Sequence, residues 1–333
     1  MTDDARHDSD QQHSWPSDVV EVNDPGQLIA AIPHLLGFYP TDSIVVLVVK
    51  DDHVDCVMRT DCPTDQALYA RVAAQLAREV DDPVGARVAV VVVGTPDRDL
   101  AGHLRDAFTA ADMAVMLFGV PEISHGAPWI DYDHSEPSGI LPDPEVSVMA
   151  VHTVAKGLVT LPSREALVAR ITPAPDDVLA RRAALLAAAR NDQDVEPTAD
   201  DVMDLVRRYT QRIVDGDERF TDDDIVQACR ALTAPEVRNA CLLPIESHPE
   251  ATEKLWLILT RQCPAPASAE AAALLAVSAY IRGDGPFARV ALDRALDIDP
   301  QHTLARLALD ALNRGVRPRN IHQLISSTQN RVL

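Results

Sequence analysis

The sequence predicts an α/β domain with a mixed, partly parallel sheet and flanking helices, followed by an all-α C-terminal domain. Two uninterrupted apolar runs, 44–49 and 87–93, have the β-branched composition of strands that are covered on both faces. Segments with helical spacing of apolar residues separate the predicted strands, and strand–helix–strand crossings of this kind favour a sheet that is at least partly parallel. After about residue 146 only helical patterns follow.

The stretch 28–49 is the centre of the predicted α/β domain and reads as a helix, a tight turn and a buried strand. Asp24 supplies an N-cap for the helix, and Pro25 suits the first helical position. Gly37 can adopt the left-handed conformation that ends a helix, and Pro40 fixes the turn that follows. We therefore expect a helix that begins near Pro25, ends at Gly37 and leads into a central strand.

Alternation, apolar runs and turn residues predict the remaining segments of the α/β domain. In chain order they are a short edge strand at 19–22, a hairpin arm at 54–59, a helix at 63–80, a second central strand at 87–93, a helix at 97–112, a strand at 113–119 and a last edge strand at 129–132. The stretch 121–144 contains seven Gly or Pro residues, so the rest of it is predicted to be a surface loop.

Helical patterns account for the second half of the chain. The predicted helices are at 146–158, 163–171, 176–190, 199–215, 222–231, 234–243 and 252–262. Residues 1–17 are polar and predict a disordered tail, and the polar, proline-terminated stretch 191–198 predicts a linker. The predicted domains are therefore an α/β domain with trailing helices at 18–190 and a helical domain at 199–333.

A tetratricopeptide-like helical hairpin is predicted at 269–302. Counting back from Pro300, the pattern of small and large residues is met by Leu275, Ala276, Gly283, Ala288, Leu292 and Ala295. Fewer than three repeats cannot bury a continuous core, so the hairpin is expected to pack on preceding helices. Two interpretations are open, a helical cap and the wall of a peptide-binding groove.

The composition argues against nucleic-acid and membrane partners. The chain of 333 residues has 51 acidic and 30 basic residues, and its net charge of −21 repels nucleic acid and anionic membranes. It contains no apolar stretch of the roughly 20 residues that span a bilayer, and its first residues lack the regions of a signal peptide. The five cysteines form no CxxC pair, as expected of reduced thiols. These features predict a cytoplasmic protein and leave its oligomeric state open.

Three segments carry a resemblance to a known family. They are LLGFYPTDS at 35–43, LPSREAL at 161–167, and RGDG followed by ARVALDRAL within 282–296. These segments resemble an actinobacterial family of proteins that carry a domain of unknown function, DUF4192. The resemblance implies no activity, substrate or catalytic residue. The chain departs from many relatives after Trp129 and Tyr132, where paired cysteines are replaced by the sequence DHSEP.

Residues near the turn within the stretch 28–49 form a candidate pocket. Ser43 follows Asp42, and His34 lies shortly before Gly37, so a hydroxyl, a carboxylate and an imidazole are close in sequence. A nucleophile site would need the His34 ring within hydrogen-bond reach of the Ser43 hydroxyl. The alternative is that Ser43 caps backbone groups of the turn, since no GxSxG motif occurs. If the α/β domain has a pocket, His34, Phe38, Asp42 and Ser43 are the residues expected to line it.

No cofactor or metal is expected from the sequence. The loop 121–144 offers five possible metal ligands, His125, Asp131, Asp133, His134 and Glu136. Their spacing matches no established metal motif, and a solvated acidic loop is the simpler interpretation. The isolated glycines form neither a Walker motif nor GxGxxG. Cys56 and Cys62 are interpreted as unreactive buried thiols rather than a redox pair.

Charged residues at predicted helix ends are the candidates for partner binding. Arg164 opens a helix behind Ser163, while Arg282, Asp284 and Arg289 lie at the turn of the hairpin. Each can contact a partner or make a local cap or ion pair. Because catalytic signatures are missing, the sequence favours a non-enzymatic protein-interaction or regulatory module whose partner is another protein. The competing hypothesis is a small-molecule-binding protein or hydrolase with a pocket at residues 38–43.

Overall fold

The computed structural model of the chain describes residues 24–50, 53–80, 86–134, 137–155, 157–192, 197–232, 248–314 and 316. The predicted tail at 1–17, the predicted edge strand at 19–22 and the predicted helix at 234–243 lie outside these residues. The predicted linker at 191–198 lies partly outside them, at 193–196.

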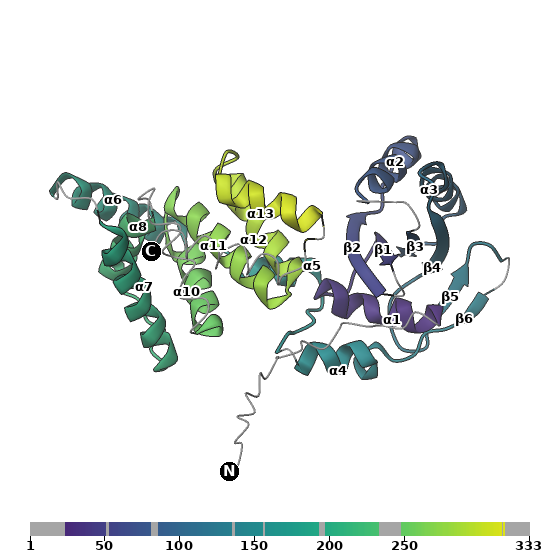
Figure 1. The fold of residues 1–333 in the computed structure, drawn as a ribbon, viewed down its shortest axis with the longest axis horizontal. Helices are drawn as coiled ribbons and strands as arrows, with labels where there is room; N and C mark the ends of the chain where they lie inside the picture. Colours follow the sequence, from purple (N-terminus) through teal and green to yellow (C-terminus); the bar gives the residue numbers. More distant parts are fainter. Residues whose placement is uncertain are drawn as a thin grey trace, which may run out of the picture.

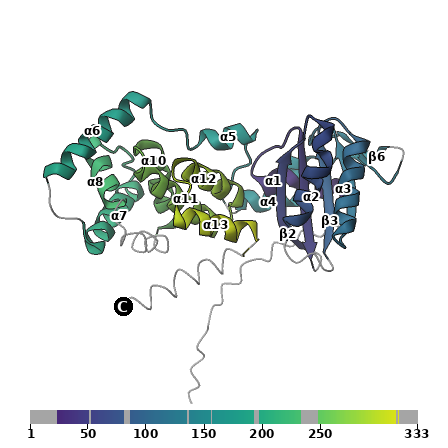
Figure 2. The same ribbon diagram turned by 90° about the horizontal axis from the view of Figure 1, so that it is seen from above.

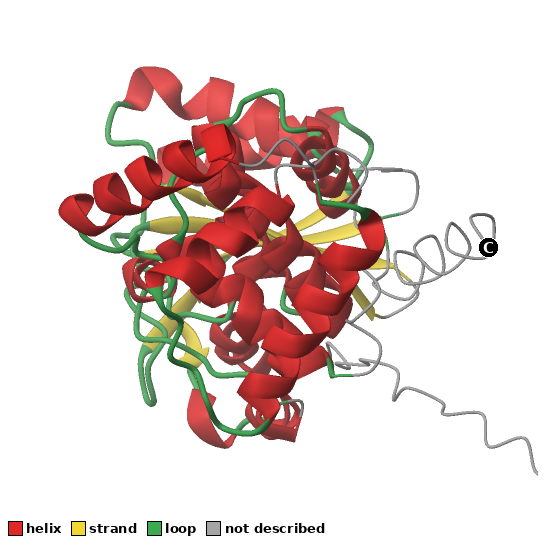
Figure 3. Ribbon diagram, turned by 90° about the vertical axis from the view of Figure 1, so that its left-hand side faces the viewer, coloured by secondary structure: helices red, strands yellow, loops and turns green. Residues whose placement is uncertain are grey.

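The described chain forms an α/β part and a helical part that lie side by side (Figures 1 and 2). The α/β part contains the six-stranded sheet, and the helical part continues from α5 to α13. Viewed from the helical side, the helices stand in front of the sheet (Figure 3). The predicted α/β class with a helical C-terminal region is confirmed.

The sheet has the strand order β2-β1-β3-β4-β5-β6. Its strands are β1 Ser43–Lys50, β2 His53–Asp61, β3 Arg87–Val93, β4 Ala114–Val120, β5 Pro128–Asp131 and β6 Pro137–Ile140. Strand β1 pairs antiparallel with β2 and β3, β3 and β4 are parallel, and β5 and β6 continue antiparallel. The sheet is therefore mixed, as predicted, with one parallel pair among the described strands.

The prediction of 129–132 as the last edge strand is wrong, because β6 pairs with β5 and forms that edge. The sequence of β6, Pro-Ser-Gly-Ile, lacks the β-branched alternation that marks a strand. Gly139 has a packing reason: a Cβ at this position would lie 2.9 Å from the Trp129 indole nitrogen. The strand therefore depends on its pairing with β5 and on the Trp129 contact rather than on its own local propensity.

Helices cover both faces of the sheet. Helix α1, Pro25–Leu36, packs on one face, while α2, Tyr69–Arg78, and α3, Arg98–Ala110, pack on the other (Figure 1). A short 3-10 turn, η1 Gln66–Leu68, precedes α2, so the predicted helix at 63–80 begins three residues later than expected. Alternate residues of β1 and β3 enter the two cores, which confirms that both strands are covered on both faces.

Helix α1 is capped as the sequence predicts. The Asp24 carboxylate accepts a hydrogen bond from the Gly26 N–H at 2.9 Å, and Pro25 occupies the first turn. Gly37 has a φ of 71°, the left-handed conformation that ends the helix. After the 3-10 turn η2, Pro144–Val146, helix α4, Val148–Ala155, packs on the outer side of α1, away from the sheet (Figure 1).

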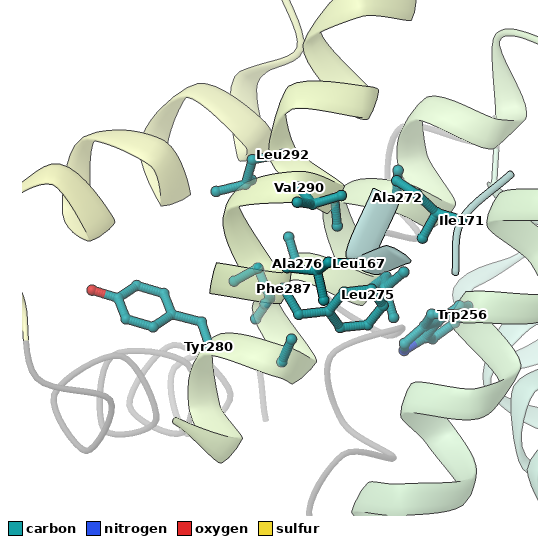
Figure 4. Packing of buried hydrophobic residues seen from close by; sticks show 14 of the residues in the cluster. Leu167, Ile171, Trp256, Ala272, Leu275, Ala276, Tyr280, Phe287, Val290 and Leu292 are labelled. Atoms are coloured by element: carbon teal, nitrogen blue, oxygen red, sulfur yellow. The ribbon is translucent and has the colours of Figure 1, made fainter. Parts of the chain in front are cut away.

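The remaining helices stack against their neighbours. They are α5 Arg164–Ala169, α6 Asp176–Asp192, α7 Ala199–Val214, α8 Asp222–Leu232, α10 Pro249–Gln262, α11 Ala267–Arg282, α12 Gly285–Ile298 and α13 Thr303–Asn313. The hairpin of α11 and α12 is the predicted helical pair, with Gly283 at a φ of 88° between the helices. It packs on α10 and α13, and Trp256, Leu275 and Phe287 lie in its core beside small residues such as Ala276 (Figure 4).

Candidate functional site

The turn from Gly37 to Ser43 leads into β1 and lies at the end of the sheet where β2 and β3 finish. It makes close contacts there. Asp42 has a φ of 42°, and its carbonyl accepts the Cys62 N–H at 2.8 Å. Gly94 follows β3 with a φ of 118°, and a Cβ there would lie 2.7 Å from an Asp42 carboxylate oxygen. The side chain of Asp42 therefore fills the space beside the end of β3.

Ser43 and His34 are not brought together. The Ser43 hydroxyl, at 0% exposure of the residue, donates to the Thr41 carbonyl at 2.6 Å and accepts from Arg59 Nε at 2.9 Å. His34 Nε2 lies 2.9 Å from the Pro144 carbonyl, and Nδ1 lies 2.8 Å from the Thr160 hydroxyl. Because a carbonyl only accepts, Nε2 is the donor in its contact with Pro144. The imidazole is thus engaged away from Ser43, and the hydroxyl acts as a buried turn contact.

Phe38 is buried in the core that α1 shares with the helical part. Its backbone pairs with Leu161 in an isolated parallel bridge. Of the four predicted pocket residues, Asp42 and Ser43 are neighbours at the turn, Phe38 is a core residue and His34 fixes the segment around η2. The geometry gives them structural contacts rather than a shared open pocket.

A polar cluster beside this turn was not predicted from the sequence. The Tyr69 hydroxyl donates to an Asp97 carboxylate oxygen at 2.7 Å, and the Asp97 N–H donates to the Tyr132 hydroxyl at 3.2 Å. The other Asp97 oxygen caps α3 by accepting the N–H groups of Asp99 and Leu100. Only the cap could have been recognised locally, because the tyrosines come from elements about 28 and 35 residues away.

The pKa shifts in this cluster leave its thiol and its Tyr69 phenol protonated at neutral pH. The Leu100 N–H and the Tyr69 hydroxyl hold the pKa of Asp97 below its ordinary value, and the same carboxylate raises the pKa of Tyr69 to about 12. Burial, followed by the charge of Asp42, raises the pKa of the nearby Cys62 thiol to about 11. At neutral pH the thiol and the phenol are therefore protonated, and neither is an activated nucleophile.

The loop residues that were weighed as metal ligands make other contacts. His134 Nδ1 lies 3.1 Å from an Asp131 carboxylate oxygen, and Asp133 forms an ion pair with Arg105 on α3. Glu136 lies outside the described residues. Within the part of the chain that the structure describes, no group of three or more His, Cys, Asp and Glu side chains is arranged to hold a metal ion.

Two of the predicted partner-binding residues, Arg282 and Asp284, support the helical hairpin. Arg282 donates to both carboxylate oxygens of Glu253, each at 2.8 Å, and to Asp284 at 3.1 Å. Asp284 also caps α12 by accepting the Phe287 N–H at 3.1 Å. These contacts tie α10, α11 and α12 together, so the pair is engaged within the fold.

The other two, Arg164 and Arg289, meet at a third residue. Arg289 Nε lies 2.9 Å from one carboxylate oxygen of Asp293. A guanidinium nitrogen of Arg164 lies 3.8 Å from the other oxygen. Arg289 also donates to the Asn313 side chain at 3.2 Å. This half-exposed network joins α5 to α12 and α13, and exposed ion pairs of this kind add about 1 kcal/mol or less.

The three segments that resemble the family meet where the two parts of the chain join. The Leu161 N–H donates to the Gly37 carbonyl at 2.8 Å, and the Tyr39 N–H donates to the Leu161 carbonyl at 3.0 Å. A Cβ on Gly37 would lie 3.8 Å from Pro286 at the start of α12. One turn further, the Arg170 guanidinium stacks on the Phe287 ring at 3.7 Å. The motifs therefore build the junction between the α/β part and the helical part.

Five of the eleven exposed large hydrophobic residues in the described part of the chain lie on and around α4. These residues, defined as the valine face, are Val146, Val148, Val151, Val154 and Val159, with exposures of 75%, 79%, 66%, 74% and 71%. On the opposite side of α4, Ala150 and Thr153 are buried towards α1. Apolar side chains that are exposed together on one short segment mark an interaction site more often than an isolated one does.

The valine face was not predicted from the sequence, because the pattern of α4 indicates burial rather than exposure. Helix α4 has the sequence VMAVHTVA, in which apolar residues occupy all sides instead of one stripe. A helix that is apolar all round is expected to be buried all round. Here α4 lies on the outside of α1, so one apolar side is left without a neighbour among the described residues.

The fold and the surface define a protein in which a mixed α/β sheet contacts a helical array through the turn at Gly37 and Leu161. An exposed apolar helix, α4, lies beside this α/β part. The sequence model of the domain of unknown function DUF4192 matches residues 25–319, and the chain therefore belongs to this family. No curated protein and no solved structure matches the chain. None of the described helices is both long enough and apolar enough to cross a membrane.

Proposed function

We propose that the protein is a non-catalytic, cytoplasmic protein-interaction module that docks another protein on the valine face. The observation that supports this most strongly is the exposure of five valines within fourteen residues, each 66% exposed or more. Water-exposed apolar surface of this kind gains free energy when a partner covers it. The satisfied polar cluster at the sheet edge, in contrast, offers no activated group.

The size of the valine face suits a weak or regulated contact. Burying an exposed valine is worth about 1.5 kcal/mol, so covering all five contributes on the order of 7 kcal/mol. Association costs about 4–15 kcal/mol in lost freedom of the two partners. The valines alone therefore support at most a weak complex, and further contacts around the face set the final affinity.

The alternative of a small-molecule-binding protein or hydrolase at residues 38–43 gains no support from the geometry. Such a site needs an open concave pocket with a base near the hydroxyl. Ser43 is instead fully covered and bonded to Thr41 and Arg59, and the His34 ring is bonded elsewhere.

The test is quantitative affinity purification from the native cytoplasm with matched variants. Val151→Asp places a charge in the valine face, while Leu307→Asp places the same charge on a 64% exposed leucine of α13. We expect a specific protein to be retained by the wild type and by Leu307→Asp and to be lost with Val151→Asp. Retention by all three folded proteins would contradict the proposal.

A further inference from the structure

The beginning of the valine face carries negative charge. Asp143 and Glu145 directly precede Val146, and the 3-10 turn η2 holds both beside Tyr39. The pKa of Tyr39 is raised first by burial of the phenol and then by the negative charges of Glu145 and Asp143. Between 137 and 163 the sequence has one basic residue, Lys156, which stands near the other end of the valine face and lies outside the described residues.

The charge of the whole chain adds to this local field. The net charge is −21, so a basic segment is attracted from a distance while a second copy of the chain is repelled. Anionic lipid is disfavoured for the same reason. The end of the apolar face at Asp143 and Glu145 therefore selects for positive charge in whatever covers it.

We propose that the segment that docks on the valine face is apolar on one side and carries Lys or Arg residues that lie against Asp143 and Glu145. This inference rests on the proposed function and names the class of partner. The apolar side supplies the contact with the valines, and the basic residues set the orientation, because only one end of the face is flanked by this acidic pair.

The dimensions of the surface fit a short amphipathic helix. Helix α4 has 8 residues and is about 12 Å long. Val148, Val151 and Val154 follow one another at three-residue steps, so they lie along one side of α4. A partner helix of three to four turns can present apolar residues at matching steps and still place basic residues beyond them.

The experiment is a binding titration of the full chain with two peptide probes. The first is an amphipathic helix of about 18 residues with a Leu and Val face and a Lys face, and the second has Glu in place of each Lys. Each is titrated at low and high salt against the wild type, Val151→Asp, Leu307→Asp and the double variant Asp143→Asn with Glu145→Gln. Asparagine keeps the oxygen with which Asp143 caps η2.

We expect the Lys peptide, and not the Glu peptide, to bind the wild type. Val151→Asp adds negative charge, so a purely electrostatic attraction of the Lys peptide would become stronger. If the peptide docks on the valine face, we expect its binding to become at least about tenfold weaker instead. Leu307→Asp should bind like the wild type. Neutralising Asp143 and Glu145 should weaken binding about three- to tenfold at low salt and by less at high salt.

Three results would overturn the proposal. They are equal binding of the two peptides, equal effects of Val151→Asp and Leu307→Asp, and sedimentation showing that the wild type pairs with a second copy through Val151. The failure of this inference is distinguishable from failure of the proposed function. If the native partner is lost with Val151→Asp but is insensitive to the charges at 143 and 145, the docking surface stands and the basic partner class is wrong.

Discussion

Gly94 provides a direct test of the packing against the turn that precedes β1. Its φ of 118° is a conformation that L side chains rarely adopt, and a Cβ there would lie 2.7 Å from Asp42 Oδ1 and 3.3 Å from Asp42 Cα. The second contact is to backbone, and Asp42 itself has a φ of 42°. The Asp42 carboxylate is exposed and can rotate away, whereas the Cα atom cannot move without opening the turn, so the backbone contact and the φ of Gly94 carry the strain.

Gly94→Ala should therefore lower the free energy of unfolding by about 2–5 kcal/mol. Backbone strain contributes about 1–3 kcal/mol, and forced close contact contributes a similar amount. The matched control is Gly102→Ala in α3, where a Cβ would meet nothing within 4 Å. Alanine is the better helix former there, so the control should be about 0.5–1 kcal/mol more stable than the wild type.

Urea unfolding followed by circular dichroism measures both variants. A loss below about 0.5 kcal/mol for Gly94→Ala would refute the reasoning, because a strained φ at a residue with a side chain costs about 1–3 kcal/mol. Equal urea midpoints for the two variants would also contradict this prediction, because Gly94→Ala is expected to lower the free energy of unfolding and Gly102→Ala to raise it.

Three further predictions follow from the other contacts. Hydrogen bonds from Arg181 and Arg182 lower the pKa of Asp222 to about 2. The stability that this carboxylate contributes is therefore present above about pH 4 and is lost as the pH falls towards 2. In an acid titration, Asp222→Asn should lose less free energy of unfolding over that window than the wild type does. The raised pKa of Cys62, about 11, predicts slow alkylation at pH 8 and a rise only near pH 11 in the native protein, whereas rapid reaction at pH 8 would argue against a protonated thiol. Arg170→Ala removes the stack on Phe287 and should cost about 1–2 kcal/mol by urea unfolding, against no more than about 1 kcal/mol for Arg164→Ala in its half-exposed ion pair.

Local chemistry made much of the α/β fold predictable. The cap at Asp24, the left-handed Gly37 and the double-sided burial of β1 and β3 are each encoded within a few residues, and the structure confirms them. Strand β6 was missed because its stability comes from pairing with β5 and from Trp129 against Gly139, not from its own sequence. Strand order likewise depends on contacts between distant segments.

The candidate sites were harder to predict for the same reason. Proximity in sequence suggested that His34 and Ser43 act together, yet the helix and turn between them direct His34 to Pro144 and Ser43 to Thr41. Charge at the hairpin turn suggested a partner for Arg282, but Glu253 on the preceding helix already binds it. The valine face could be recognised only once α4 was known to lie outside α1.

The most direct test of the proposed docking surface is photo-crosslinking inside the native cell. A photoreactive amino acid replaces Val151 in one strain and Leu307 in another, two helical positions with exposures of 66% and 64%. If the valine face is the docking surface, we expect a crosslinked product of one defined mass from position 151 and its absence from position 307. The same product from both positions, or a product from 307 alone, would contradict the assignment of the valine face as the docking surface.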